Sequence, residues 1–237
     1  MAVGVVVPTY DEAANIEALI RGIRTSVPDA HVVVVDDGSP DGTGRLAEAL
    51  NEQLGGITVL HRTEKAGLGA AYRAGFAKAL EMGLDPICQM DADLSHDTAD
   101  LPRLIEAPGS VRLGSRYVPG GGTRNWPWLR RFISRGGTLY ARIWLGLPHR
   151  DLTGGFKCWS ADALRAIDIE TVGSEGYVFQ IETTWRASCL GFEISEVPIV
   201  FTERIAGESK MNSRIAREAV WRVPLLRLSG RFQGERS

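Results

Sequence analysis

The sequence has few cysteines, no long apolar run and none of the glycine-rich loops of common nucleotide-binding folds. Its three cysteines, Cys88, Cys158 and Cys189, lie far apart without the spacing of metal ligands. They therefore predict buried thiols in a reducing compartment. No apolar run approaches the roughly 18–20 residues of a membrane span. We also expect no signal peptide, because Met1 leads directly into a strand-like segment.

Two familiar phosphate-binding motifs are missing. The turn after the first expected strand, residues 8–12, reads Pro-Thr-Tyr-Asp-Glu instead of a glycine fingerprint. Residues 67–69 supply Gly-Leu-Gly without a third glycine, and no Gly-Lys-Ser/Thr occurs. These gaps argue against a dinucleotide site and a phosphate loop. The pair Asp36-Asp37 is compatible with a phospho-acceptor receiver domain, but that fold would be complete in about half this length.

What is present is an alternation of apolar strand and helix patterns. With 237 residues and 44% hydrophobic content, the chain can bury one large core. Strand patterns occur at residues 4–8, 31–35, 57–60 and 87–90, and residues with helical spacing separate them. Those residues are Ile16, Leu19, Ile20, Ile23 and Val27, then Leu46, Leu50 and Leu54, then Leu68, Ala71, Tyr72, Gly75, Phe76, Ala79 and Leu80. The alternation predicts an α/β fold with a parallel, doubly wound sheet.

The net charge of −2 conceals an uneven distribution. Residues 117–150 hold six arginines and no acid, giving +6, and residues 211–237 hold six arginines and two glutamates, giving +4. The remaining residues therefore carry −12. Two basic blocks in an otherwise acidic chain predict two basic surfaces that face something anionic.

The segment from Ile87 to Asp93 ends an apolar run on two carboxylates, Asp91 and Asp93. If the run is a buried parallel strand, both acids lie at its carboxyl end, where open α/β sheets place their ligands. Alternate residues of an extended chain also point the same way. Mg²⁺ takes one or two protein carboxylates together with phosphate oxygens and water. An Asp-x-Asp triplet also arises by chance, so a metal site needs support from the rest of the chain.

Three polar residues after the first two strands have open interpretations. Asp37 can accept hydrogen bonds from a base or ribose, or it can act as a turn or cap acid, for which Asp36 and Asp41 are better placed. Glu12 can face a nucleotide or stabilise the first turn of a helix. Tyr10 can be an ordinary rim aromatic.

Four segments then occur in a characteristic order. They are residues 7–16 (Val-Pro-Thr-Tyr-Asp-Glu-Ala-Ala-Asn-Ile), 35–43 (Val-Asp-Asp-Gly-Ser-Pro-Asp-Gly-Thr), 90–96 (Met-Asp-Ala-Asp-Leu-Ser-His) and 114–117 (Gly-Ser-Arg-Tyr). Together they resemble the family 2 inverting glycosyltransferases of GT-A fold, and more closely the dolichyl-phosphate (polyprenyl-phosphate) mannose synthases. Residues 204–211 (Arg-Ile-Ala-Gly-Glu-Ser-Lys-Met) match the late Arg-x-x-Gly-Glu-Ser-Lys segment of that family.

The resemblance covers about residues 3–212. It implies a GT-A fold, with a Rossmann-like, mostly parallel sheet flanked by helices. The expected division is a catalytic domain over residues 1–211 and a basic, amphipathic C-terminal tail over residues 212–237.

The resemblance also implies a nucleotide-sugar site. The guanine and ribose of GDP-mannose would be held by Pro8, Tyr10, Glu12, Val35 and Asp37. The sugar, the diphosphate and a Mg²⁺ or Mn²⁺ ion would be met by Asp91, Ala92 and Asp93. Ser95 falls where some members place a further metal-side ligand, often Gln, although a hydroxyl is a poorer ligand.

The phosphate-binding cations implied by the family are Arg116, Arg204 and Lys210. This role suits their chemistry, because Arg recognises phosphate bidentately and Lys supplies a movable point charge. The expected catalytic residues are Asp91, Asp93 and Arg116. Residues 151–159 match the family too, but whether Asp151 and Thr153 touch the acceptor, and whether Gln180 and Glu182 line the pocket or are helix-end polar groups, stays open.

The implied activity is transfer of mannose from GDP-mannose to a polyprenyl monophosphate with inversion, giving polyprenyl-phosphate β-mannose. The departing diphosphate needs a divalent cation and cationic side chains. The acceptor is a phosphate monoester with a second pKa of about 6, so it is already anionic at pH 7. We therefore expect no catalytic base.

The acceptor end must meet a membrane. Three of the six tryptophans, Trp126, Trp128 and Trp144, lie between Gly120 and Leu147 and are expected at the membrane interface. An apolar helical face is expected from Leu129, Phe132, Ile133, Leu139, Tyr140, Ile143, Trp144 and Leu147, beside a basic face with Arg131, Arg135 and Arg142. This mixture is typical of an interfacial helix, and a core-packed helix is the alternative. Residues 212–232 repeat the mixture around Pro224. Some family members continue here into transmembrane helices, whereas this chain stops.

We therefore expect a cytoplasmic protein bound peripherally to the inner face of the membrane. Attachment would come from its own surface or from a membrane-anchoring or acyltransferase partner protein, and no nucleic acid is expected as a partner. Two other functions stay open. One is a family 2 transferase that uses another nucleotide-sugar, such as a glucose donor, or a carbohydrate acceptor, which should carry a base in its late motif. The other is a non-catalytic nucleotide-binding subunit recruited to membranes, which need not keep Asp91, Asp93, Arg116, Arg204 and Lys210 together.

Overall fold

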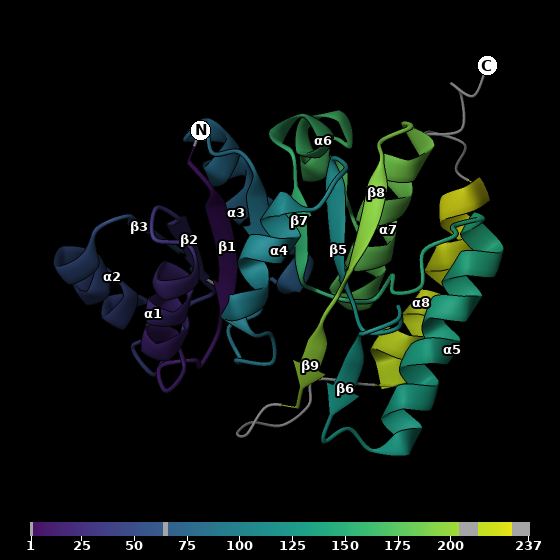
Figure 1. The fold of residues 1–237 in the computed structure, drawn as a ribbon, viewed down its shortest axis with the longest axis horizontal. Helices are drawn as coiled ribbons and strands as arrows, with labels where there is room; N and C mark the ends of the chain where they lie inside the picture. The colour runs from purple at the N-terminus through teal and green to yellow at the C-terminus, as the bar shows by residue number, and fades with distance from the viewer. Residues whose placement is uncertain (1, 64–65, 204–212, 229–237) are drawn as a thin grey trace.

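The computed structural model describes residues 2–63, 66–203 and 213–228, with the backbone alone for residues 213–219 (Figure 1). The strands are β1 (Gly4–Thr9), β2 (His31–Asp36), β3 (Ile57–His61), β4 (Ile87–Gln89), β5 (Val111–Ser115), β6 (Gly122–Arg124), β7 (Lys157–Trp159), β8 (Ile194–Pro198) and β9 (Val200–Thr202). The helices are α1 (Ile16–Ser26), α2 (Thr43–Leu54), α3 (Leu68–Glu81), α4 (Leu101–Glu106), α5 (Trp128–Leu145), α6 (Ala161–Ala166), α7 (Gly176–Cys189) and α8 (Ser213–Leu228), with short 3-10 helices η1 (Thr98–Asp100) and η2 (Ile169–Thr171).

A seven-stranded sheet in the order β3-β2-β1-β4-β7-β5-β8 forms the centre of the protein. Its neighbouring strands are parallel except at β7, which runs antiparallel to both β4 and β5. The mostly parallel sheet expected from the sequence is therefore confirmed. β6 and β9 pair in a separate small sheet at the end of the molecule toward which β1 runs (Figure 1).

Helices cover both faces of the sheet, as a parallel sheet requires. Val5 and Val7 of β1 pack with α1, α2 and α4 on one face, and Val6 packs with α3, α6 and α7 on the other. Gly75 lets α3 lie close to the sheet, because a Cβ there would come within 2.3 Å of a Val6 methyl group. The expected inward position of Leu46 is wrong: the buried face of α2 centres on Ala47 and Leu50, which leaves Leu46 to one side and 44% exposed.

The cysteines follow the expectation in part. Cys88 and Cys158 are buried free thiols that face each other across β4 and β7. Cys189, at the end of α7, is only half-buried, because it packs at the edge of the α5–α7–α8 cluster.

At the right of Figure 1, α5 and the yellow α8 lie side by side, and α8 also contacts α7. Val223 of α8 is fully buried in this cluster, together with Ala141 and Leu145 of α5. The Tyr140 hydroxyl donates to the Val220 carbonyl at 2.7 Å. α8 continues through Pro224, so the proline does not end the helix.

Candidate active site

The carboxyl ends of the parallel strands meet at one edge of the sheet, and the described site residues predicted from the sequence lie in the last residues of those strands or just after them. β1 ends at Thr9, β2 at Asp36, β4 at Gln89 and β5 at Ser115. Pro8 and Val35 lie opposite each other in the register of β1 and β2. This edge is where open α/β sheets bind their ligands.

The two acids at the end of β2 have different surroundings. Asp36 accepts hydrogen bonds from the Thr9 hydroxyl at 3.2 Å and from the Ser39 hydroxyl at 2.5 Å, so it is a turn acid as expected. Asp37 is only 6% exposed, and its Oδ1 pairs with Arg62 Nη1 at 2.9 Å. Arg62 thus fixes the Asp37 carboxylate at the strand end, and contact of Asp37 with a nucleotide stays a prediction.

Glu12 precedes α1 instead of lying in its first turn. Its backbone N–H donates to the Thr43 hydroxyl at 3.0 Å, which ties the loop after β1 to the start of α2. Its carboxylate accepts from Asn15 Nδ2 at 2.8 Å, beside the first residue of α1. Asp41 holds the same loop, because it accepts from the Ala13 N–H at 2.9 Å.

Asp91 and Asp93 come two and four residues after the end of β4, in a loop and not in the strand itself. Both acids are partly exposed, whereas Ala92 between them is 3% exposed. Leu94 adopts a left-handed conformation with φ 59°, which costs a non-glycine residue free energy. The turn lets the Ser95 N–H donate to Asp93 Oδ1 at 3.1 Å. The loop therefore holds Asp93 through its own backbone.

The chemistry of this corner fits a hard divalent cation. Two carboxylates suffice for Mg²⁺ or Mn²⁺ when substrate oxygens and water complete the coordination. The Ser95 hydroxyl is buried beside them and has no hydrogen-bond partner among the described residues. Those residues contain no cluster of three or more His, Cys, Asp and Glu side chains suited to a metal, so a closed all-protein site is not what they form.

Sequence reasoning missed two neighbours of Asp91. The Tyr72 hydroxyl donates to Asp91 Oδ1 at 2.9 Å, and His96 Nε2 lies 3.7 Å from Asp91 Oδ2. Burial, reinforced by the charge of Asp91, raises the pKa of Tyr72 well above its ordinary value, so the hydroxyl remains a donor. Neither ring nitrogen of His96 has a hydrogen-bond partner within the described part of the chain. The sequence did contain one indication of the Tyr72 contact. Tyr72 places a hydroxyl on the apolar face of a helix, and a buried hydroxyl needs a hydrogen-bond partner.

Arg116 lies in a buried ion pair that the sequence did not predict. Its Nε and Nη2 donate to the two oxygens of Asp151 at 2.7 Å each, and Nη2 also donates to the Thr153 hydroxyl at 2.9 Å. The guanidinium carbon lies 5.3 Å from the Trp126 ring centroid. Burial alone would raise the pKa of Asp151, but the charge of Arg116 lowers it below the ordinary value. Asp151 and Thr153 thus hold Arg116, whose phosphate-binding role stays a prediction.

A buried polar layer lies behind the acids. Gln89 Nε2 donates to Gln180 Oε1 at 2.8 Å and to the Gly155 carbonyl at 2.9 Å. Glu182 lies in the interior of α7, where it pairs with Arg186 and accepts from the Ser174 hydroxyl. Gln180 and Glu182 are 2% and 4% exposed, so neither is a solvated helix-end group.

Lys157 belongs to the same buried layer. Its Nζ donates to the Gln180 carbonyl at 2.7 Å and to the Thr184 hydroxyl at 3.0 Å. Burial lowers the pKa of Lys157 to about 7, against a smaller opposing effect of Asp151. Arg204 and Lys210, the other two predicted phosphate-binding cations, lie outside the described residues.

Comparison with known proteins places the chain in a family. The model of glycosyl transferase family 2 matches residues 4–168. The chain belongs to this family. Two relatives align with this family 2 glycosyltransferase over most of their own length and nearly all of this chain. An undecaprenyl-phosphate mannosyltransferase from Micrococcus luteus is 48% identical, covering 100% of this chain and 98% of the relative. A polyprenol monophosphomannose synthase from Mycolicibacterium smegmatis is 45% identical, covering 98% and 89%.

Solved structures confirm the fold of this glycosyltransferase. A mycobacterial protein superposes with a TM-score of 0.67 at 19% identity, covering 92% of this chain and 72% of that one. The mannosyltransferase PcManGT from Pyrobaculum calidifontis, in complex with GDP-Man and Mn²⁺, gives a TM-score of 0.58 at 20% identity, covering 91% and 60%. The expected GT-A architecture is therefore confirmed.

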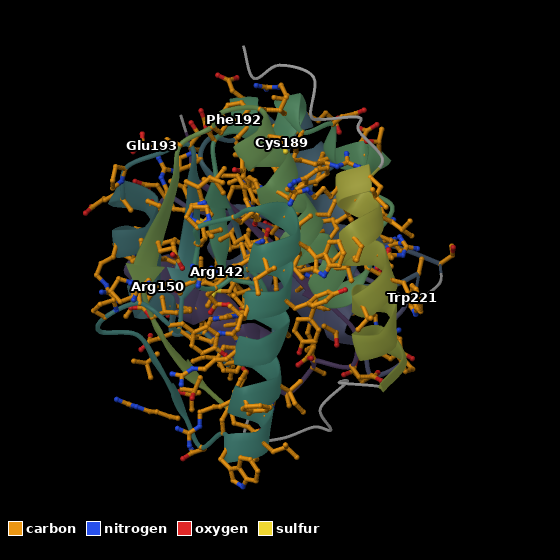
Figure 2. All side chains as sticks on the ribbon, turned by 90° about the vertical axis from the view of Figure 1, so that its right-hand side faces the viewer. Arg142, Arg150, Cys189, Phe192, Glu193 and Trp221 are labelled. Carbon is orange, nitrogen blue, oxygen red and sulfur yellow. The ribbon has the colours of Figure 1, made fainter. Side chains whose placement is uncertain are left out.

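The glycosyltransferase exposes large apolar side chains on α5 and α8. Trp128 and Phe132 of α5 are 75% and 72% exposed, and Trp221 of α8 is 76% exposed. Figure 2 faces this side and shows the two helices next to each other, with Arg142 and Trp221 labelled. Trp126 departs from the expected interfacial face: it is 6% exposed, because its ring packs against Arg116 and Phe201. Among the described helices, none has both the length and the apolarity needed to cross a bilayer.

Proposed function

We propose that this family 2 glycosyltransferase transfers mannose from GDP-mannose to a polyprenyl monophosphate with inversion, giving polyprenyl-phosphate β-mannose. The observation that carries this proposal is the pair Asp91 and Asp93 at the carboxyl end of β4, in a chain similar over nearly its whole length to proteins named for this chemistry. The donor lies along the edge formed by β1, β2 and β4, with the base toward Asp37 and the diphosphate toward Asp93.

Asp91 and Asp93 hold Mg²⁺ or Mn²⁺ in this proposal, with Ser95 beside them. When bound, the cation neutralises the charge that develops on the departing diphosphate. The sequence predicts further positive charge from Arg204 and Lys210. The acceptor needs no deprotonation, since a phosphate monoester is anionic at pH 7. What the protein supplies is orientation, so that an acceptor oxygen attacks the anomeric carbon opposite the diphosphate.

We propose that the acceptor arrives along α5. The Tyr117 hydroxyl, next to Arg116, donates to the Ser134 hydroxyl of α5 at 2.7 Å. The Arg135 guanidinium lies 5.2 Å from the Tyr117 ring centroid. The end of β5 is thus tied to a helix that carries both basic and exposed apolar side chains. This arrangement supports delivery of a lipid-linked phosphate from the α5 side.

The α5–α8 face, with exposed Trp128, Phe132 and Trp221, is our candidate for docking on an anionic membrane. Arg131 and Arg135 add exposed positive charge to the same helix. Amphipathic helices with aromatic and basic residues lie in the membrane interface. Attachment at the cytoplasmic face, and any anchoring or acyltransferase partner, belong to this proposal.

The transfer reaction tests the function directly. The purified protein is incubated with radiolabelled GDP-mannose, polyprenyl phosphate and Mg²⁺, and the products are extracted into organic solvent. We expect label in the organic phase only when both the acceptor and the metal are present. Label transferred from UDP-glucose instead would favour another nucleotide-sugar, and no transfer with tight nucleotide binding would favour a non-catalytic subunit.

Flotation with lipid vesicles tests the membrane face. Binding to anionic vesicles should weaken steeply with salt, because each basic residue near the surface contributes about 1 kcal/mol that ions screen. The double variant Trp128→Ala/Trp221→Ala should float less, whereas Leu46→Ala removes an exposed leucine elsewhere and serves as the control. Equal flotation of all three proteins would remove this surface from the proposal.

A further inference from the structure

The Asp91 carboxylate is enclosed by groups from two distant segments and from its own loop. Tyr72 of α3 donates to its Oδ1 at 2.9 Å. Gly155 lies against it, so closely that a Cβ there would come within 2.9 Å of Oδ2. The His96 ring nitrogen Nε2 is 3.7 Å from Oδ2. The side chain therefore has little room to rotate.

The Tyr72 ring is held independently of its hydroxyl. It is fully buried and stacks on Phe76 and on Phe179, with ring centroids 5.7 and 5.9 Å away. A phenylalanine would fill the same space. The hydroxyl thus adds one hydrogen bond, directed at Asp91, to a ring that packing already places.

The two groups near Asp91 Oδ2, His96 and Gly155, are also held in place by packing and hydrogen bonding. The His96 ring stacks on Phe156 with centroids 5.0 Å apart and meets Phe201 edge-on at 5.0 Å. The Gly155 carbonyl also accepts a hydrogen bond from Gln89 Nε2, and this bond fixes the backbone beside Asp91. The Asp91 carboxylate therefore lies between Tyr72 on one side and His96 with Gly155 on the other. Because Oδ1 is bonded to the buried Tyr72 hydroxyl, the orientation of the whole carboxylate is fixed.

We propose that Tyr72 is a positioning residue for the transfer reaction: its hydroxyl holds Asp91 Oδ1 so that the carboxylate faces the cation that accompanies the sugar nucleotide. The inference rests on the proposed function, because it takes Asp91 to be a metal ligand. Partners that orient metal ligands typically change metal affinity or activity 10–100-fold when they are removed. In this proposal Tyr72 acts on the cation only through Asp91.

The test is Tyr72→Phe, with Mn²⁺ binding to the protein–GDP complex measured by calorimetry alongside kcat, KM and the melting temperature. We expect Mn²⁺ affinity to fall about 10–100-fold, kcat to fall with it, and the KM for GDP-mannose at saturating Mn²⁺ to change little. Tyr140→Phe, which removes a tyrosine hydroxyl bonded to a carbonyl outside the site, should bind Mn²⁺ like the wild type. Phe179→Leu should lower the melting temperature while keeping most of the Mn²⁺ affinity.

The failures are separable. If the wild type transfers mannose and Tyr72→Phe binds Mn²⁺ as the wild type does, the positioning role is wrong and the proposed function stands. Loss of affinity in Phe179→Leu equal to that in Tyr72→Phe would also overturn it, because packing alone would then explain the effect. A wild type that binds no Mn²⁺ with GDP and transfers nothing would overturn both.

Discussion

Replacing Lys157 with methionine should change how the stability of this protein depends on pH. Lys157 is fully buried in the layer behind the acids. The replacement removes the hydrogen bonds from Lys157 to the Gln180 carbonyl and the Thr184 hydroxyl. Neither group is left without a partner, because the Thr184 hydroxyl donates to the Gln180 carbonyl at 2.9 Å. Methionine has a similar length and no charge to desolvate. The variant therefore isolates the cost of burying one amine.

The direction follows from the proton that this amine binds. Burial lowers the pKa of Lys157 from 10.5 to about 7 in the folded protein, so between these values the unfolded chain holds a proton that the folded protein has released. The free energy of unfolding of the wild type therefore rises with pH across this window, by about 1.4 kcal/mol per pH unit from this group. Below pH 7 the buried, protonated amine lowers the free energy of unfolding by an amount that the pKa difference puts at about 5 kcal/mol. Relaxation of the protein around the buried charge makes this loss smaller.

Urea unfolding at several pH values between 7 and 9.5 measures the effect. We expect Lys157→Met to be at least as stable as the wild type at pH 7 and its stability to rise less steeply by about 1 kcal/mol per pH unit. Lys78→Met removes a partly exposed lysine paired with Glu81 and should keep the wild-type slope. If the slopes of the wild type and Lys157→Met are parallel, Lys157 does not release its proton in this range, and the reasoning is refuted.

Three further predictions concern the site. Asp93→Asn should reduce mannose transfer more than about 100-fold with an unchanged melting temperature, because metal stabilisation of the leaving group is worth several kcal/mol; full activity in this variant, or in wild type with excess EDTA, would contradict the metal assignment. GDP should compete with the donor more strongly than UDP or ADP, and equal affinities by calorimetry would leave only a generic sugar-nucleotide site. Asp151→Ala should cost about 3–5 kcal/mol in urea unfolding, because it leaves Arg116 buried and unpaired; a loss below about 1 kcal/mol would mean that water reaches the guanidinium.

The acid pair could be predicted from the sequence because its geometry is local. Asp91 and Asp93 come just after a short apolar strand, so the sequence alone places both at its carboxyl end. The parallel strands up to β4 were predictable for the same reason, since each is a short apolar run followed by a helical pattern. Asp36 was recognisable as a turn acid because its partner Ser39 is three residues away.

The partners of these groups could not be predicted, because they depend on how distant segments meet. Arg116 and Asp151 are 35 residues apart, and nothing in either segment encodes the pairing. Tyr72 has the spacing of a core residue, and only the fold brings its hydroxyl to Asp91. Similarly, Trp126 and Trp128 are two residues apart with the same composition around them, yet one is buried and the other exposed.

The antiparallel strand β7 also constrains the order in which the protein can fold. β5 and β8 join the rest of the large sheet only through β7, which lies between β4 and β5. On a ribosome, β1 to β4 can pair as soon as they emerge, but β5 must wait for residues 157–159 before it has a neighbour on that side. Pairings of this kind are slow because a long loop closes first. The same segment carries Gly155 to Asp91, so the surroundings of Asp91 and the join between the two halves of the sheet both depend on residues 155–159.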